Sequence, residues 1–580
     1  MAGFSVIISE KNHFPETLQF PGSNAINPIG NHLIRSISNE SIRVQQNTHN
    51  KFPEDTILGE NENYIIVTDG VLLNLSEMLM KHNQKNCFEL MVFLYERMGV
   101  EFTKSLRGDF SGIIYDKKNK TCFCFTNHTG SKRIFHYHQN DYLIVCTDLA
   151  KLSSLLHELK ISIHLNQTAA YLLLTCGFML EQHTLIENVK RLMPGSYLLY
   201  SDYKVKISNY FHLTNVVQTK DSRDEIIERM DELFSNAVKL EFEKDKAYGY
   251  KHAATLSGGL DSRMTVLIAH KLGYTDQLNY TFSQTGYLDE KIARKIANDH
   301  NHKFYFQPLD GGDYLKAIDE TVMINDGLVS YSSAAHALFT IKKMNLETYG
   351  LIHTGMIGDA VIGSFLSAPD TVQPTYTDGM FSKSLAHKVQ KEITEIISCY
   401  PDEESYKFYS RAFLGAMTGN YAVDVTTQAI SPFLEPDFLS YCYSIPKAMK
   451  YKQRIYLEWI ADKHPEFAKY PWEKTGVSPL KSNNWKKFTE IGYYQRMSLK
   501  LFDRINSKIS SGMNPMDYWF SNNESLRNFI ESYFIKHIEL LNAYPELQND
   551  SRLLFENGNS GEKFQVLTLL SAIQLHGIKN

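Results

Sequence analysis

Long apolar runs, a strong net charge and patterned cysteines are all missing from this chain of 580 residues. No apolar run reaches the length of a membrane span, and no basic segment with an apolar core follows Met1, so we expect a cytoplasmic protein without a membrane partner. The formal net charge of -5 is mild for this length, and nothing in it suggests nucleic acid as a partner. The seven cysteines follow no zinc or disulfide spacing, which fits a reducing compartment.

The chain does have enough residues for two or three domains with full cores. Residues 1–212 are rich in short strand-like runs, separated by turn residues such as Asp69-Gly70, with two helix-like segments near 89–98 and 167–174. Strands with few helices predict a layered α+β domain. The expected strands are 4–9, 64–67, 112–115, 121–125, 142–146 and 196–200.

Beyond residue 213 the pattern changes to helices that alternate with strands. Ser222 and Glu225 have the form of a capping box, and apolar residues then recur at three and four. The expected strands that follow end near 256, 283 and 306. This alternation predicts a parallel α/β sheet that binds ligands at the carboxyl ends of its strands. We expect this domain to occupy residues 213–483 and a helical extension to occupy 484–580.

The stretch A-A-T-L-S-G-G-L-D-S-R at 253–263 places a glycine turn between a strand and a helix. The unpaired N–H groups and the positive end of the helix suit a phosphate, and glycines let it approach closely. Asp261 would repel a bare phosphate, so its presence favours a divalent cation between the two. A plain Gly-Ser turn is the alternative. The candidate phosphate-binding residues are Ser257, Gly258, Gly259, Asp261 and Ser262.

The S-G-G-x-D-S pattern resembles the pyrophosphate loop of ATP pyrophosphatases, which split ATP into AMP and pyrophosphate. The phrases L-R-G-D-F-S-G-I-I-Y-D at 106–116, G-S-K-R-I-F-H-Y at 130–137 and P-G-S-Y-L at 194–198 resemble the glutamine amidotransferase domain of asparagine synthetases. The phrase H-T-G-M-I-G-D-A-V-I-G at 353–363 resembles a loop of their synthetase domain. The chain is therefore similar to the asparagine synthetase superfamily, which implies an Ntn-hydrolase-like domain followed by an ATP-pyrophosphatase domain.

The resemblance implies ATP and Mg²⁺ as cofactors. It implies that Asp261 and Asp359 share the magnesium, although Asp359 could instead cap a helix. It implies that Arg454 and Lys474 offset negative charge during the reaction, although each could be a solvated surface charge. The residues that it implies for the nucleoside pocket are Leu256, Thr354 and Gly355.

The chain departs from the family pattern at three places, and each bears on the source of the nitrogen in the new amide bond. Ala2 replaces the nucleophilic cysteine of the glutaminase, and a methyl group cannot attack an amide. The glutamine-binding phrase is reduced to Asp69-Gly70-Val71, which an engineered Cys-to-Ala change at position 2 would not explain. Met356 replaces a glutamate of asparagine synthetases and a tyrosine of β-lactam synthetase, and its thioether cannot move a proton. We expect no glutaminase activity, and Met356 in an apolar acceptor pocket.

The resemblance implies adenylation of a carboxylate by Mg·ATP, followed by attack of an amine. Our first hypothesis is macrolactam closure of a peptide, as in lasso peptide cyclases, with a leader-peptide-binding protein or a protease as partner. The second is amidation of a carboxylated sugar with ammonia. The third is an inactive member of the family that acts as a scaffold.

Overall fold

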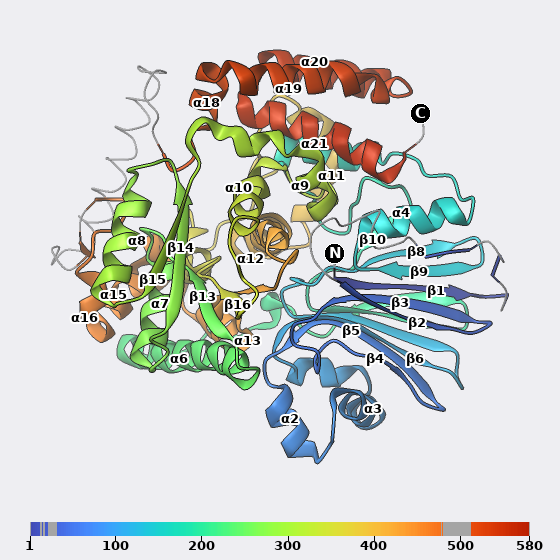
Figure 1. The fold of residues 1–580 in the computed structure, drawn as a ribbon, viewed down its shortest axis with the longest axis horizontal. Coiled ribbons are helices and arrows are strands. Elements are labelled where there is room, and N and C mark those ends of the chain that lie inside the picture. The colour runs from blue at the N-terminus through green and yellow to red at the C-terminus, as the bar shows by residue number, and fades with distance from the viewer. Residues whose placement is uncertain are drawn as a thin grey trace.

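The computed structural model describes residues 2–11, 14–15, 18–20, 32–476, 478–479 and 512–578. Its N-terminal region contains two antiparallel sheets, drawn in blue and cyan in Figure 1. The first sheet has the order β10 (Val189–Arg191), β8 (Phe135–Gln139), β9 (Tyr142–Cys146), β1 (Gly3–Ser9), β3 (Ile42–His49) and β2 (His32–Ser38). The second has the order β12 (Lys204–Asn209), β11 (Ser196–Ser201), β7 (Thr121–Thr126), β6 (Gly108–Asp116), β5 (Tyr64–Leu72) and β4 (Leu58–Glu60).

The two sheets pack face to face, and helices cover their outer faces. Alternation along β1 shows how: Phe4, Val6 and Ile8 lie in the core between the sheets, whereas Ile7 belongs to the core on the helical side. Helices α4 (Leu149–Glu158) and α5 (Gln167–Cys176) share that helical-side core, and α2 (Leu75–His82) and α3 (Cys87–Met98) pack on the second sheet. The expected layered α+β domain is confirmed.

One expected turn is wrong. Asp69 and Gly70 lie inside β5, where they pair with Ser111 and Phe110 of β6. Gly70 has a φ of 109°, and a Cβ built on it would meet the Asp109 carbonyl oxygen at 2.0 Å. The glycine is needed here because the neighbouring strand approaches closely. In sequence, an Asp-Gly pair kept for this reason cannot be told from one that forms a turn.

The second domain begins with α6 (Arg223–Ala247), whose first turn carries the expected capping box of Ser222 and Glu225. Its parallel sheet has the order β15 (Lys303–Pro308), β14 (Gln277–Ser283), β13 (Lys251–Thr255), β16 (Tyr349–His353) and β17 (Ala429–Ile430). The strand order reverses between β13 and β16. In an open α/β sheet, this reversal opens the crevice in which ligands bind.

Helices surround this sheet and continue to the C-terminus (Figure 1). Those of the second domain are α7 (Asp261–Lys271), α8 (Leu288–Asp299), α9 (Ile318–Asn325), α10 (Ser332–Ile341), α11 (Ala386–Ile397), α12 (Glu403–Lys407), α13 (Pro436–Ser444), α14 (Lys447–Lys450), α15 (Arg454–Lys463) and α16 (Pro465–Ala468). In the described part of the chain, no helix is both long and apolar enough to span a bilayer.

The described C-terminal residues, 512–578, are helical and are drawn in red in Figure 1. They form α18 (Met516–Asn522), α19 (Glu524–His537), α20 (Pro545–Asn557) and α21 (Ser560–His576). Helix α21 contacts α4 and α5 of the first domain and α9 of the second, so the extension joins both. The expected boundary at 483/484 lies outside the described residues.

Candidate active site

Two loops meet where the strand order reverses: residues 256–260 after β13 and residues 354–359 after β16. Gly355 is the point of contact, because a Cβ there would lie 2.2 Å from the Ser262 backbone nitrogen. A Cβ on Gly358 would lie 2.8 Å from Asp261 Cγ. Both glycines therefore allow the second loop to reach the start of α7.

This approach brings Asp261 and Asp359 together, although 98 residues separate them in sequence. The Asp359 N–H donates to Asp261 Oδ2 at 3.1 Å, and the buried Tyr456 hydroxyl donates to Asp261 Oδ1 at 2.8 Å. Lys474 Nζ donates to Asp359 Oδ2 at 3.2 Å. Asp261, Asp359 and Lys474, three of the residues predicted from the sequence, thus form one cluster.

The charges in this cluster suit a divalent cation. Burial and the neighbouring charge of Asp359 raise the pKa of Asp261 to about 7. Burial opposes the charged form of Lys474, but Asp359 and Asp261 still raise the pKa of that lysine. Two carboxylates that repel each other, beside a cation, match the one or two protein ligands that Mg²⁺ takes next to phosphate oxygens. The donor set therefore fits Mg²⁺.

The N–H groups of the glycine loop already have partners within the protein. Gly258 N–H donates to Asp289 Oδ1 at 2.7 Å, Ser257 N–H to Ser262 Oγ at 2.9 Å, and Gly259 N–H to Ser257 Oγ at 3.1 Å. An anion on the Gly258 N–H must therefore displace the carboxylate of Asp289. The first N–H groups of α7 lie beside this loop at the positive end of the helix.

Sequence reasoning missed four residues of this site: Tyr456, Asp289, Arg263 and Glu473. Arg263 is fully buried and donates to the carbonyl oxygens of residues 258, 467, 470 and 471, so it ties the glycine loop to the segment that leads to Lys474. Burial and the charge of Asp289 raise the pKa of Glu473 to about 7. Arg263 directly follows the D-S of the motif, which was the available signal; Tyr456 and Glu473 follow no pattern in the sequence.

The remaining predicted residues lie around this cluster or apart from it. Leu256 is fully buried, and the Thr354 hydroxyl donates to the Ile430 carbonyl at 2.9 Å. Met356 is half-buried against the main core. Arg454 lies at the start of α15 with 62% of its side chain exposed, and its Nε donates to Glu458 Oε1 at 2.9 Å. The structure thus pairs Arg454 within its own helix and not with the two aspartates.

The space beside Ala2, which stands where the family has its nucleophilic cysteine, is small. Ala2 lines two cavities of only about 20 and 10 Å³. Lys132 from the first domain donates to Asp424 Oδ2 of the second at 2.9 Å and lies 4.0 Å from Asp69 Oδ2. A cavity of about 10–15 Å³ holds one water molecule, so neither space admits a glutamine side chain.

Comparison with known proteins gives two family matches in the order of the two domains. Residues 52–211 match the glutamine amidotransferase domain model, and residues 229–390 match the asparagine synthase model. A solved structure of glutamine phosphoribosylpyrophosphate amidotransferase from B. subtilis, complexed with ADP and GMP, is 11% identical, with coverage of 72% of this chain and 89% of its own. Its TM-score of 0.23 is too low to support an argument.

Two curated relatives are asparagine synthetases by name. A putative asparagine synthetase [glutamine-hydrolyzing] 2 of Methanocaldococcus jannaschii is 24% identical over 59% of this chain and 68% of its own length. Asparagine synthetase [glutamine-hydrolyzing] 1 of Bacillus subtilis is 20% identical over 49% of this chain and 45% of its own length, so the match spans less than half of that relative. With both family domains present in this order, the chain belongs to the asparagine synthetase superfamily.

Proposed function

We propose that this protein is an ATP-dependent amide-forming ligase, which adenylates a substrate carboxylate before an amine attacks it. The observation that carries this proposal is the cluster of Asp261, Asp359 and Lys474 in the crevice of a parallel sheet. Such a site suits a nucleoside triphosphate, because the carboxylates can bind its metal ion and the lysine can bind its phosphate oxygens.

In the first step, a carboxylate oxygen of the substrate attacks the α-phosphorus of ATP, and the α–β bond breaks to release pyrophosphate. Mg²⁺, when bound, supplies charge neutralisation for the phosphate oxygens. Asp261 must lose its proton to serve as a ligand, and the Tyr456 hydroxyl holds its Oδ1. Lys474 lies where it can offset the charge that develops on the leaving pyrophosphate.

In the second step, the amine nitrogen attacks the acyl carbon, AMP leaves with the bridging oxygen, and the amine gives up a proton to the phosphate of the departing AMP. The closed cavity beside Ala2 supports an amine that is not released from glutamine by this chain. Among amines we propose one within the substrate itself, with a peptide that closes into a macrolactam. The half-buried thioether of Met356 supports an acceptor side without a proton-transferring residue.

Substitution of the paired aspartates tests the site without knowledge of the substrate. Titration calorimetry with Mg²⁺ and an ATP analogue that cannot break between the α and β phosphates measures binding directly. We expect Asp261→Asn and Asp359→Asn to weaken binding on the order of 100-fold, because each removes one carboxylate from the metal site. Asp276→Asn is the matched control, since Asp276 is 67% exposed and pairs with Lys303. Equal affinity in all three variants would contradict the proposed function.

Exchange of labelled pyrophosphate into ATP then identifies the acid. Exchange that depends on a precursor peptide supports macrolactam closure. Exchange that depends on a uronic acid, with product formed from free ammonia, replaces this substrate assignment with sugar amidation. Binding of the ATP analogue without exchange on either substrate class would favour a scaffold.

A further inference from the structure

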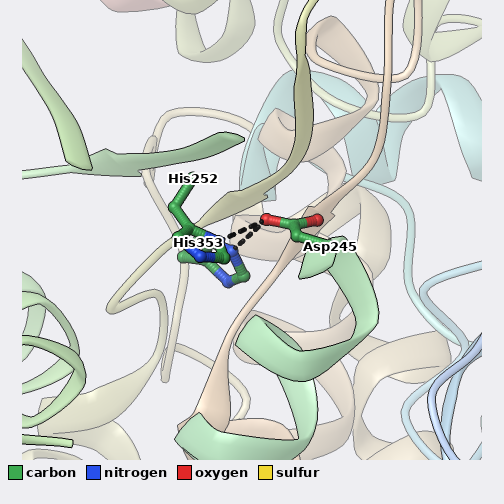
Figure 2. A group of neighbouring side chains, drawn as sticks. All are labelled: Asp245, His252 and His353. Atoms are coloured by element: carbon green, nitrogen blue, oxygen red, sulfur yellow. Dashed lines mark hydrogen bonds and ion pairs between the residues drawn. The ribbon is translucent and has the colours of Figure 1, made fainter. Parts of the chain in front are cut away.

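A buried ionic cluster lies directly behind the loop that carries Asp359. It consists of Glu241 and Asp245 of α6, His252 of β13 and His353, the last residue of β16. His353 Nε2 lies 2.9 Å from Asp245 Oδ2, and His353 Nδ1 lies 3.1 Å from Glu241 Oε2. Figure 2 shows both histidine rings turned towards the Asp245 carboxylate. His252 Nδ1 lies 3.1 Å from Asp245 Oδ2.

His353 carries a positive charge in this cluster. The side chains of His353 and Asp245 are completely buried and Glu241 is 2% exposed. Burial alone would lower the pKa of His353, but Asp245 and Glu241 raise it to about 9. Both ring nitrogens therefore donate, each to its own carboxylate, and the Phe242 ring stacks on the imidazolium at a centroid distance of 3.7 Å.

Other charged groups act on the cluster from its neighbours. Lys51 acts on Asp245, and Asp109 of β6 acts on Glu241. Burial raises the pKa of Glu241 to about 7, whereas the charge of His353 holds the pKa of Asp245 below its usual value against the effect of burial. His353 is thus the cation that lies between the two carboxylates of the cluster.

The cluster ties one end of α6 to both strands of the crevice. Asp245 Oδ1 accepts the Leu351 N–H at 2.8 Å, and a Cβ on Gly350 would lie 2.0 Å from the same oxygen. Asp245 therefore holds β16 at two points, through Leu351 and His353, and reaches β13 through His252. The two loops that bring Asp261 and Asp359 together leave from these two strands.

We infer that His353 is a positioning residue of the nucleotide site: held between Glu241 and Asp245, it fixes the end of β16 and thereby the loop that carries Gly355 and Asp359. The inference rests on the proposed function, because its effect is read through nucleotide binding. Removal of the cation leaves two buried carboxylates facing a neutral group, and β16 must shift to relieve them.

A metal ion is the competing explanation for this cluster. Asp245 Oδ2, His252 Nδ1 and His353 Nε2 lie within 4.8 Å of one another, a spacing that metal ligands also show. Hydrogen bonds account for the geometry better. One nitrogen of each histidine lies within hydrogen-bond distance of Asp245, and the second nitrogen of His353 donates to Glu241. Metal analysis of the purified protein separates the two explanations.

His353→Gln tests the inference, with His336→Gln as the matched control. His336 of α10 is half-buried, and burial lowers its pKa to about 4, so its loss removes no charge. We expect His353→Gln to keep a cooperative thermal unfolding transition and to bind the Mg·ATP analogue at least tenfold more weakly. Folded His353→Gln that binds as the parent does would overturn the inference, and so would one equivalent of metal that is lost in His252→Ala.

The pH profile adds a readout that a general packing defect would not produce. The pKa of His353 is about 9 in the folded chain, above its usual value, so its stabilisation is complete below about pH 6.5 and is lost as the pH rises through 9. We expect the melting temperature of the parent to fall between pH 6.5 and 9.5, and its analogue affinity to fall only above about pH 8, because Asp261 first loses its proton near its pKa of about 7. The profile of His353→Gln should be flatter over this range, and a slope equal to that of the parent would contradict the inference.

Glu241→Gln keeps the test decisive if His353→Gln does not fold. This variant retains an acceptor for His353 Nδ1 but removes one negative charge, which lowers the pKa of His353. The midpoint of the pH-dependent loss of affinity should therefore move by about one pH unit towards neutral. An unchanged midpoint in Glu241→Gln would overturn the inference. If Asp359→Asn binds the analogue as the parent does, the proposed function itself fails. If only Asp359→Asn loses affinity, the inference about His353 fails alone.

Discussion

At the scale of single residues, Ala2 of the first domain lies beside an ion pair that joins the two domains. Ala2 has no nucleophilic side-chain atom, and Lys132 and Asp424, which are 2.9 Å apart, line the small cavity beside it. Burial opposes the charge of this lysine, but Asp424 and Asp69 raise its pKa, so Lys132 keeps its charge. A buried pair of this kind is costly to break, because the remaining charge is left without a partner.

Restoring the missing nucleophile tests whether residue 2 alone was lost. We expect Ala2→Cys to release no more glutamate from glutamine than the parent, because a cavity of about 20 Å³ cannot admit the substrate. Coupled detection of glutamate measures this. The double variant Ala2→Cys with Lys132→Ala opens the cavity and serves as the comparison. Glutamate release by Ala2→Cys alone would show that the pocket is open in solution.

At the scale of structural elements, the site depends on how closely the loop after β16 approaches α7. Gly355 permits this contact, since any larger residue would strike the Ser262 backbone. The same loop is also constrained at Ile357, whose φ of 67° is rare for a β-branched residue. The loop is therefore held in one unusual conformation by its neighbours.

A methyl group at position 355 should separate the two loops. We expect Gly355→Ala to destabilise the chain by about 1–3 kcal/mol and to reduce binding of the Mg·ATP analogue at least tenfold, because the backbone cannot yield without moving Asp359. Thermal unfolding and calorimetry measure the two effects. Gly419→Ala is the control, since a Cβ there would meet only the Ser333 carbonyl oxygen at 3.7 Å. Unchanged binding in Gly355→Ala would show that this contact is not required.

At the scale of the whole molecule, the C-terminal helices form part of the common core. Every residue of α21 from Phe564 to Ile573 is buried, and the helix contacts both the first domain and the second. A helix buried all round belongs to a core and is not an appended module. The two domains consequently share one core through α21.

Truncation of a side chain in α21 should therefore weaken the whole chain. We expect Leu570→Ala to cost about 2–5 kcal/mol, because Leu570 is completely buried and its loss leaves a cavity. Leu553→Ala in α20 should change stability by less than about 0.5 kcal/mol, since Leu553 is 51% exposed. Denaturant unfolding followed by fluorescence measures both. A Leu570→Ala variant as stable as Leu553→Ala would contradict a shared core.

The sequence by itself determined the elements whose signals are local. The capping box of Ser222 and Glu225, the glycine loop before α7 and the strand at 142–146 all lie where their patterns predict them. Caps, turns and periodicity act over a few residues, so neighbouring side chains are sufficient to specify them. The pairing of Asp261 with Asp359 was also predictable, but only through resemblance to a family.

The tertiary structure alone decided what lies between distant segments. It placed Asp69-Gly70 inside a strand, brought Asp424 to Lys132 beside Ala2, paired Arg454 with Glu458, and set His353 between two carboxylates. These outcomes depend on groups from other elements, whose approach, burial and charge follow from the packing of the complete chain. No pattern within a short window carries that information.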